Sequence, residues 1–207
     1  MGVSGFRTLS GLHFNVSIPV QTTRNVVYQT GLNEAATTSN PGFTAVTLSP
    51  VKISGNTVVG KDLLTQCNDD IVAFVVDSLQ KEIAYKIEDY MLGKVVASNP
   101  TEINYSALSA IDWDDILAFE AALSTFDLGE PQYVMSAGAR SALKGTPKVS
   151  AYPDFLCSAD NYINGYKCNV SGCVGNDNIY FGDWDKLVLG IFGSGLETII
   201  NPYSYAK

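Results

Sequence analysis

Residues 68–93 read NDDIVAFVVDSLQKEIAYKIEDYMLG, and this stretch decides the fold. Asn68 is the expected N-cap, Asp69 and Asp70 favour the positive end of the helix dipole, and Gly93 is the expected stop. Such a helix is a rod of roughly 36 Å, long enough to serve as a scaffold for other elements. Its apolar residues recur at three- and four-residue spacing and form one stripe: Ile71, Val72, Val75, Leu79, Ile83, Ile87 and Tyr90.

Charged residues on this helix are spaced for pairing along one face. Asp77 precedes Lys81 by four positions, and Glu82 precedes Lys86 by four. An acid placed four residues before a base is the favoured orientation on a helix. We therefore expect both pairs to form.

The region before the helix, residues 14–55, alternates in the manner of β-strands. The pattern predicts strands at 14–20, 26–29 and 43–48, with a polar, turn-rich segment at 31–41. Pro19 excludes a central strand position for the first of them. Because a lone hairpin is marginal in water, we expect this excursion to cover a neighbouring part of the fold or to reach a neighbouring molecule.

The region after the helix mixes both kinds of element. A second helix is expected from Asp112 to Phe126 and a short one from Ser136 through Leu143, with Gly145 as its stop. The class is therefore α+β. Strands are expected at 133–135, 166–174, 178–181, 187–192 and 196–201.

Composition limits the function classes. The chain has 207 residues, a net charge of −8 and only 16% charged residues. No Lys/Arg cluster appears, which argues against specific nucleic-acid binding and against anionic membranes. The longest apolar run, 71–76, is far too short to span a membrane. A sparsely charged surface suits a subunit that buries much of itself against partners.

The four cysteines, Cys67, Cys157, Cys168 and Cys173, do not have the spacing of a zinc site. We expect reduced, partly buried thiols. If 166–174 is one strand, Cys168 and Cys173 point to opposite faces of it.

No set of ionisable residues converges on a catalytic site. His13 is the only histidine and precedes the first strand. Asp112, Asp114 and Asp115 could form a metal or acid/base group, but helix capping explains them more simply. Asp183 and Asp185 beside Trp184 are interpreted as turn residues. We therefore predict a structural or binding protein, with no catalytic residue, cofactor or metal.

The order of these segments resembles the major capsid protein of tailed bacteriophages, the Hong Kong 97 fold. The likeness spans nearly the whole chain, and the ordered set of segments carries it rather than any single motif. Those segments are Asn15–Pro19, Phe43–Pro50, Lys61–Gln66 leading into the long helix, Val134–Leu143, and Tyr180–Trp184 followed by 187–191.

The resemblance implies a domain plan. Residues 1–13 would be the remnant of an N-terminal arm, and 14–55 an extended β-hairpin loop lying across the neighbouring subunit. Residues 56–106 and 193–207 would form the peripheral domain with the spine helix 68–93, and 107–192 a mixed helix/sheet axial domain. The chain departs from the family pattern at both ends, which implies truncation. Lys52, the only lysine near the loop, lies at its base, so the covalent cross-linking of some members is not carried over.

The implied function is a structural head protein that self-assembles into an icosahedral shell around a phage or prophage genome. Its partners would be copies of itself in hexamers and pentamers, with a portal, a scaffold and a maturation protease as further ones, and its place the virion head after synthesis in the host cytoplasm. Expected subunit-contact residues are Val26, Val27, Tyr28 and Phe43, with packing on their own subunit as the alternative. Rival functions are an encapsulin-type nanocompartment shell and a small hydrolase using the Asp112–Asp115 cluster.

Overall fold

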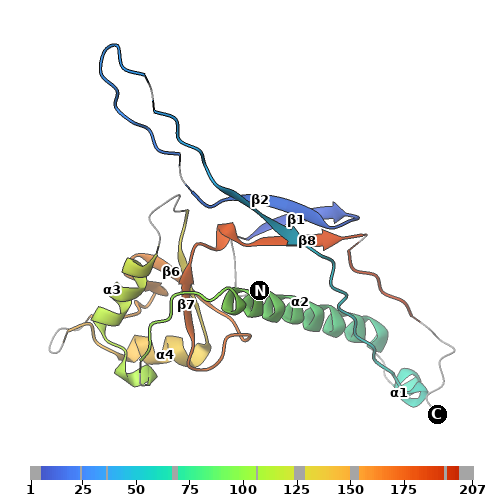
Figure 1. Ribbon diagram of the computed structural model, residues 1–207. Helices are drawn as coiled ribbons and strands as arrows, with labels where there is room; N and C mark the ends of the chain where they lie inside the picture. The colour runs from blue at the N-terminus through green and yellow to red at the C-terminus, as the bar shows by residue number, and fades with distance from the viewer. Residues whose placement is uncertain are drawn as a thin grey trace. The chain divides into compact units, whose positions relative to one another are not determined.

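The computed structural model describes residues 6–23, 25–35, 37–66, 70–105, 107–123, 129–149, 154–193 and 195–200. The chain divides into two compact units. The first contains residues 1–7, 53–188 and 198–207, and the second contains 8–52 and 189–197. Both helices and strands are present, in agreement with the predicted α+β class (Figure 1).

The long helix of the first unit is α2, Ile71–Ala97. Asp70 is its N-cap and accepts a hydrogen bond from the Ala73 amide at 3.2 Å, whereas Asn68 lies outside the described residues. The predicted end at Gly93 is wrong, because the helix continues for one more turn to a C-cap at Ser98. Val95 in that added turn packs against buried core residues, which favours continuation through the glycine.

Only one of the two predicted charge pairs on α2 is confirmed. Lys81 binds Asp77 at 2.5 Å. Lys86 binds Asp89 at 2.6 Å instead of the predicted Glu82. Residues three and four apart on a helix are both neighbours, so the spacing alone could not choose between the two acids.

The four-stranded sheet of the first unit has β4, Gln132–Met135, as an inner strand. Its order is β5-β6-β4-β7. Strand β4 runs parallel to β6, Tyr166–Val170, and antiparallel to β7, Ile179–Gly182. Strand β5, Tyr162–Ile163, closes one edge against β6.

Two helices accompany this sheet, α3, Trp113–Ala122, and α4, Ala137–Gly145 (Figure 1). The predicted cap at Ser136 is confirmed, since its hydroxyl accepts from the Ala139 amide at 3.0 Å. Helix α4 includes Gly145, which we expected to be its stop, and its C-cap is Thr146. The unit is completed by α1, Lys61–Gln66, and two short 3-10 helices, Leu108–Ala110 and Trp184–Lys186.

The core of the first unit lies around β4. Tyr133, Val134 and Met135 have no exposed surface. Tyr133 stacks on Phe181 at 4.2 Å between ring centroids and meets Phe119 edge-on at 6.4 Å. Aromatic pairs in these geometries contribute beyond the area that they bury, so this cluster fixes the sheet against α3.

In its described residues the second unit contains strands and no helix. It holds β1, Arg7–Leu12, beside β8, Val188–Phe192, with one end residue of each strand, Arg7 and Val188, assigned to the first unit. It also holds β2, Val16–Gln21, paired antiparallel with β3, Phe43–Leu48.

Three predicted strands differ from the structure. Residues 26–29 form no strand, because the opposite arm of the hairpin makes no ladder with them. Strand β6 stops at Val170, where Ser171 turns the chain by accepting from the Cys173 amide at 3.1 Å, so Cys173 is not part of it. The described part of the last predicted strand, 196–200, has no strand partner among the described residues.

Candidate functional site

The candidate functional site is the long hairpin of the second unit. Its base is a six-pair antiparallel ladder in which Val16 opposes Leu48 and Gln21 opposes Phe43. Two further main-chain bonds, from the Thr22 and Thr23 amides to the Gly42 carbonyl at 2.8 and 3.4 Å, continue the pairing outward. We call this two-stranded part, 16–21 with 43–48, the ribbon.

Beyond the ribbon, the two arms of the hairpin are held together only sparsely. Among the described residues of 25–41, the cross-arm bond is that of the Val26 amide to the Ser39 hydroxyl at 3.2 Å. The other described main-chain groups of this stretch make no hydrogen bond across the hairpin, apart from those of the closing turn. An extended chain in this state can still form a ladder with another molecule.

The hairpin closes at Gly31–Glu34. The Glu34 amide donates to the Gly31 carbonyl at 3.2 Å, and its carboxylate accepts from the Gly31 amide at the same distance. Asn33 has φ of 74°, a left-handed conformation that asparagine tolerates better than most residues. The predicted turn-rich segment therefore contains the turn that reverses the chain.

The structure places all four sequence-predicted contact residues on the surface. Val27 is 93% exposed, and Val26, Tyr28 and Phe43 are exposed as well. None of them is packed into a core of the described chain. The three consecutive residues 26–28 lie together on one arm, whereas Phe43 lies at the outer end of the ribbon.

Sequence reasoning missed other exposed apolar residues of this unit. Leu32 is fully exposed at the closing turn, and Phe14 is exposed just before β2. Val20 and Val46 are 42% and 50% exposed within the ribbon. The alternation along 43–48 could have identified Val46 as exposed. Only the pairing register between β2 and β3 shows which other side chains lie on the same face of the ribbon.

The acidic cluster of the first unit has a structural role. Asp112 accepts from the Asp115 amide at 3.1 Å, and Asp115 accepts from the Asp112 amide at 3.2 Å. This reciprocal pair is a capping box for α3, as the capping interpretation predicted. Asp183 likewise accepts from the amides of Asp185 and Gly129. Within the part of the chain that the structure describes, no group of acids, histidines or cysteines could hold a metal ion.

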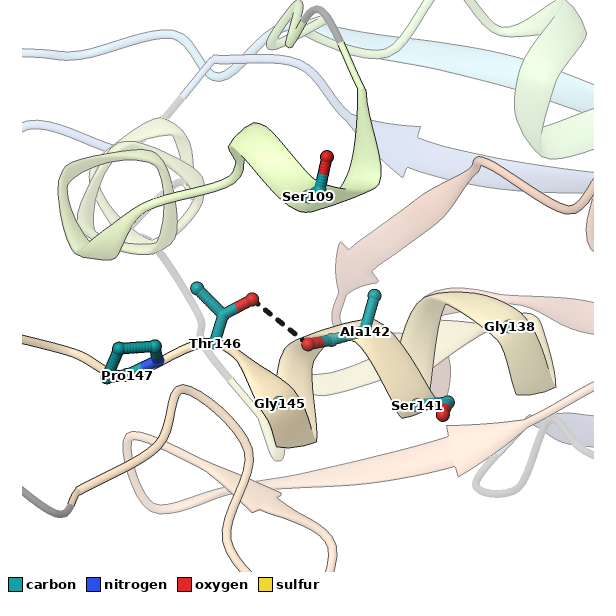
Figure 2. A pocket seen from close by; sticks show the side chains of 7 residues that line it. All are labelled: Ser109, Gly138, Ser141, Ala142, Gly145, Thr146 and Pro147. Carbon is teal, nitrogen blue, oxygen red and sulfur yellow. Dashed lines mark hydrogen bonds between the residues drawn. The ribbon is translucent and has the colours of Figure 1, made fainter.

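Two hollows of the first unit are candidate ligand sites. The one in Figure 2 has a volume of about 640 Å³ and lies over α4, where Thr146 donates to the Ala142 carbonyl at 3.0 Å. None of its lining residues is ionisable. The other, of about 740 Å³, lies along β7, and its charged lining residues are Glu102, Asp177, Asp183 and Lys186. Neither holds a nucleophile paired with a base.

The cysteines of the first unit are buried thiols, as expected. Burial raises the pKa of Cys168 to about 12 and also raises the pKa of Cys157. Both are free, and Cys173 is free and half-buried, whereas Cys67 lies outside the described residues. A raised pKa keeps a thiol protonated and unreactive, so these residues contribute packing rather than chemistry. No described helix is both long and apolar enough to cross a bilayer.

Known proteins resemble this chain in sequence. A family model described as the phage capsid family matches residues 5–207. The major capsid protein of Halomonas phage phiHAP-1 is 28% identical over 206 residues, which cover 93% of this chain and 34% of that protein. The chain therefore spans about a third of the length of this curated relative.

Solved structures share the fold. A capsid of a native GTA particle, computed with C5 symmetry, matches with a TM-score of 0.68 at 13% identity, covering 87% of this chain and 72% of that one. A structure from Microbacterium phage Oxtober96 matches with a TM-score of 0.66 at 16% identity, covering 93% and 72%. The fold is thus that of phage and GTA capsid subunits, as the Hong Kong 97 resemblance predicted.

Proposed function

We propose that this chain, which belongs to the phage capsid family, is the shell-forming head protein of a tailed phage or prophage. Copies of it associate through repeated interfaces and build an icosahedral wall around the genome. Rings arise when such head-to-tail contacts close. The role is structural rather than catalytic.

The exposed hairpin is the observation that carries this proposal. An arm whose described main chain makes a single bond to the opposite arm, and whose consecutive Val26, Val27 and Tyr28 are exposed, is poorly stabilised by its own subunit. It gains hydrogen-bond and apolar partners when it lies against another copy. In this proposal, Val26, Val27, Tyr28 and Phe43 are subunit-contact residues and 14–55 is the extended loop.

The remaining domain plan follows the family. Residues 56–106 and 193–207 form the peripheral domain with α2 as its spine, and 107–192 form the axial domain, whose copies meet at the symmetry axes. Enclosure of the genome needs a closed wall rather than affinity for DNA, so a net charge of −8 is compatible with it. The portal, scaffold and maturation protease are proposed partners, and synthesis takes place in the host cytoplasm before incorporation in the virion head.

Assembly of the full 207-residue chain tests the proposal. We expect rings or shells by negative-stain electron microscopy and fast-sedimenting species by analytical ultracentrifugation. A chain that remains monomeric over a wide range of protein and salt concentration would overturn the proposed function.

A matched pair of variants tests the contact residues. V26S/V27S/Y28S removes the apolar side chains of the exposed arm, and we expect it to raise the concentration needed for assembly by about tenfold or more. N25S/Q29S/T30S changes flanking polar positions of the same arm and should assemble as the wild type does. Equal assembly of the two variants would exclude 26–28 as contacts.

A further inference from the structure

The ribbon has two chemically different faces. Paired residues of an antiparallel ladder share a face, and successive residues alternate between faces. The register thus separates an apolar side from a side of mixed character. One side, which we call the valine face, carries Val16, Ile18, Val20, Thr44, Val46 and Leu48. The other side, which we call the opposite face, carries Ser17, Pro19, Gln21, Phe43, Ala45 and Thr47.

The inner end of the valine face is packed within its own unit. A Cβ atom on Gly190 would lie 3.3 Å from a Leu48 methyl group and 3.1 Å from a Leu12 methyl group, so the glycine lets these side chains sit directly on strand β8. Leu48 and Ile18 are half-buried, but Val46 and Val20, farther from this contact, are exposed. The apolar surface therefore continues outward past the point where the described chain covers it.

The charge distribution along the chain indicates what covers the remainder. The two longest stretches without Asp, Glu, Lys or Arg are residues 8–23 and 35–51, and each contains one strand of the ribbon. Two copies of a chain with net charge −8 repel each other except where their contact surfaces carry no charge. An uncharged ribbon is thus the surface on which like-charged copies meet at the lowest electrostatic cost.

The outer edges of the ribbon also favour a second copy of this chain as the partner. The ribbon is a two-stranded sheet, so each strand has one outer edge without a strand neighbour in the described chain. Proteins that must stay monomeric protect such edges with charged residues or proline. The ribbon has no charged residue and its single proline, Pro19, lies on β2, so the edge of β3 carries neither kind of protection.

We infer that the outer part of the valine face, Val20 and Val46, docks on a second copy of this chain, while Gln21 and Thr47 on the opposite face take no part in this contact. The inference rests on the proposed function and adds to it the orientation of the loop. Phe43 lies on the other side of the ribbon, so its proposed subunit contact is separate from this one, and Val20 and Val46 are the specificity-determining residues of the valine face.

Two double variants of equal charge test the orientation. V20K/V46K places two lysines on the valine face. Q21K/T47K places two lysines at the exposed positions that follow Val20 and Val46 in sequence and lie on the opposite face. All four sites are exposed in the single chain, so both variants should keep the circular dichroism spectrum and melting temperature of the wild type. We expect V20K/V46K to lose assembly in ultracentrifugation and negative stain, and Q21K/T47K to assemble normally.

The outcomes separate the inference from the proposed function. If the wild type assembles and V20K/V46K assembles equally well, or if Q21K/T47K is the variant that fails, the inferred orientation is overturned and the proposed function stands. If the wild type forms no oligomer at all, both are overturned.

A second variant keeps the test decisive if lysines disturb folding. V20T/V46T retains side-chain shape and β-branching and replaces one methyl group by a hydroxyl at each site. We expect about a tenfold higher concentration for half-assembly, because the hydroxyls must be desolvated at the contact. S17V/T47V, which makes the opposite face more apolar, should leave that concentration unchanged, and a lower value would contradict the inference.

Discussion

Strands β3 and β4 are built from similar residues but have opposite surroundings. Strand β4, Gln132–Met135, lies between two neighbouring strands, and its last three side chains have no exposed surface. Strand β3, Phe43–Leu48, has one neighbour, and of its six side chains only Leu48 is even half-buried. Both sequences favour strands. The difference shows that β-propensity predicts the strand, whereas the partners on its faces and edges decide whether it is a core or a contact surface.

Replacing a valine by alanine in each of the two strands should give the largest difference in the free energy of unfolding. Val134→Ala in β4 should lower the free energy of unfolding by about 2–3 kcal/mol, because it leaves a cavity in a fully buried site. Val46→Ala in β3 should change it by about 0.5 kcal/mol or less, because the side chain is half exposed. Chemical denaturation followed by tryptophan fluorescence measures the first, since Trp113 and Trp184, the only two tryptophans, both lie in the first unit.

Hydrogen exchange supplies the readout for the ribbon, which contains no tryptophan. Amides of 16–21 and 43–48 should keep their protection in Val46→Ala when the chain is unassembled. If Val46→Ala unfolds the ribbon, Val46 is required by its own subunit, and the contrast between the two strands is lost.

Alkaline pH should lower the stability of the first unit and leave the pairing of the ribbon unchanged. The pKa of Cys168 rises from 9.0 to about 12 on burial, so the folded first unit prefers the neutral thiol. Its stabilising contribution is complete below about pH 9 and is lost as the pH rises towards 12, because only the unfolded chain releases the proton in that window. Between pH 9 and 11, the wild type should lose about 2 kcal/mol more stability than C168A. The two ribbon strands contain no ionisable side chain, so their pairing should not respond.

This prediction is checked by denaturant titrations of both proteins at pH 7, 9, 10 and 11. C168A is less stable than the wild type at neutral pH because of the lost side-chain volume, so the comparison is between the two slopes against pH. The slope that remains in C168A arises from other groups whose pKa values are raised by burial, among them Cys157, Tyr133, Cys173 and Tyr105. Parallel slopes would show that Cys168 ionises in the folded state as easily as in the unfolded state.

Patterns with local causes were predictable from the sequence. The span 43–48 was predicted to the residue, because alternation and flanking turn residues are local. The caps at Asp112 and Ser136 were also predicted, because a capping side chain bonds only to the next turn.

Features that depend on distant partners were not predictable. Helix α2 continues past Gly93 because Val95 meets a core formed by residues far along the chain. Residues 26–29 have the composition of a strand and form none, because no described segment forms a ladder with them. At the candidate site, the exposed arm 26–28 was found from the sequence, but the valine face was not, since it requires the register between β2 and β3.

The smallest expected difference in stability is between substitutions of Asp112 and Asp114, which lie within one turn of α3. Asp112 uses its carboxylate to cap α3, whereas Asp114, two residues on, is an exposed first-turn residue. Asp112→Ala should lower the stability of the first unit by about 1 kcal/mol, because it leaves the amide of Asp115 without its acceptor. Asp114→Ala should cost at most about 0.5 kcal/mol at low salt, through the helix dipole alone. Asp112→Asn, which can still accept the Asp115 amide, should recover most of the loss, and equal effects of the two alanine variants would show that the capping geometry does not stabilise the helix. Each carboxylate of the capping box accepts a hydrogen bond from the main-chain amide of the other residue, so a structural role accounts for both side chains. We therefore expect Asp112→Ala to alter stability and to leave the assembly of the folded fraction unchanged.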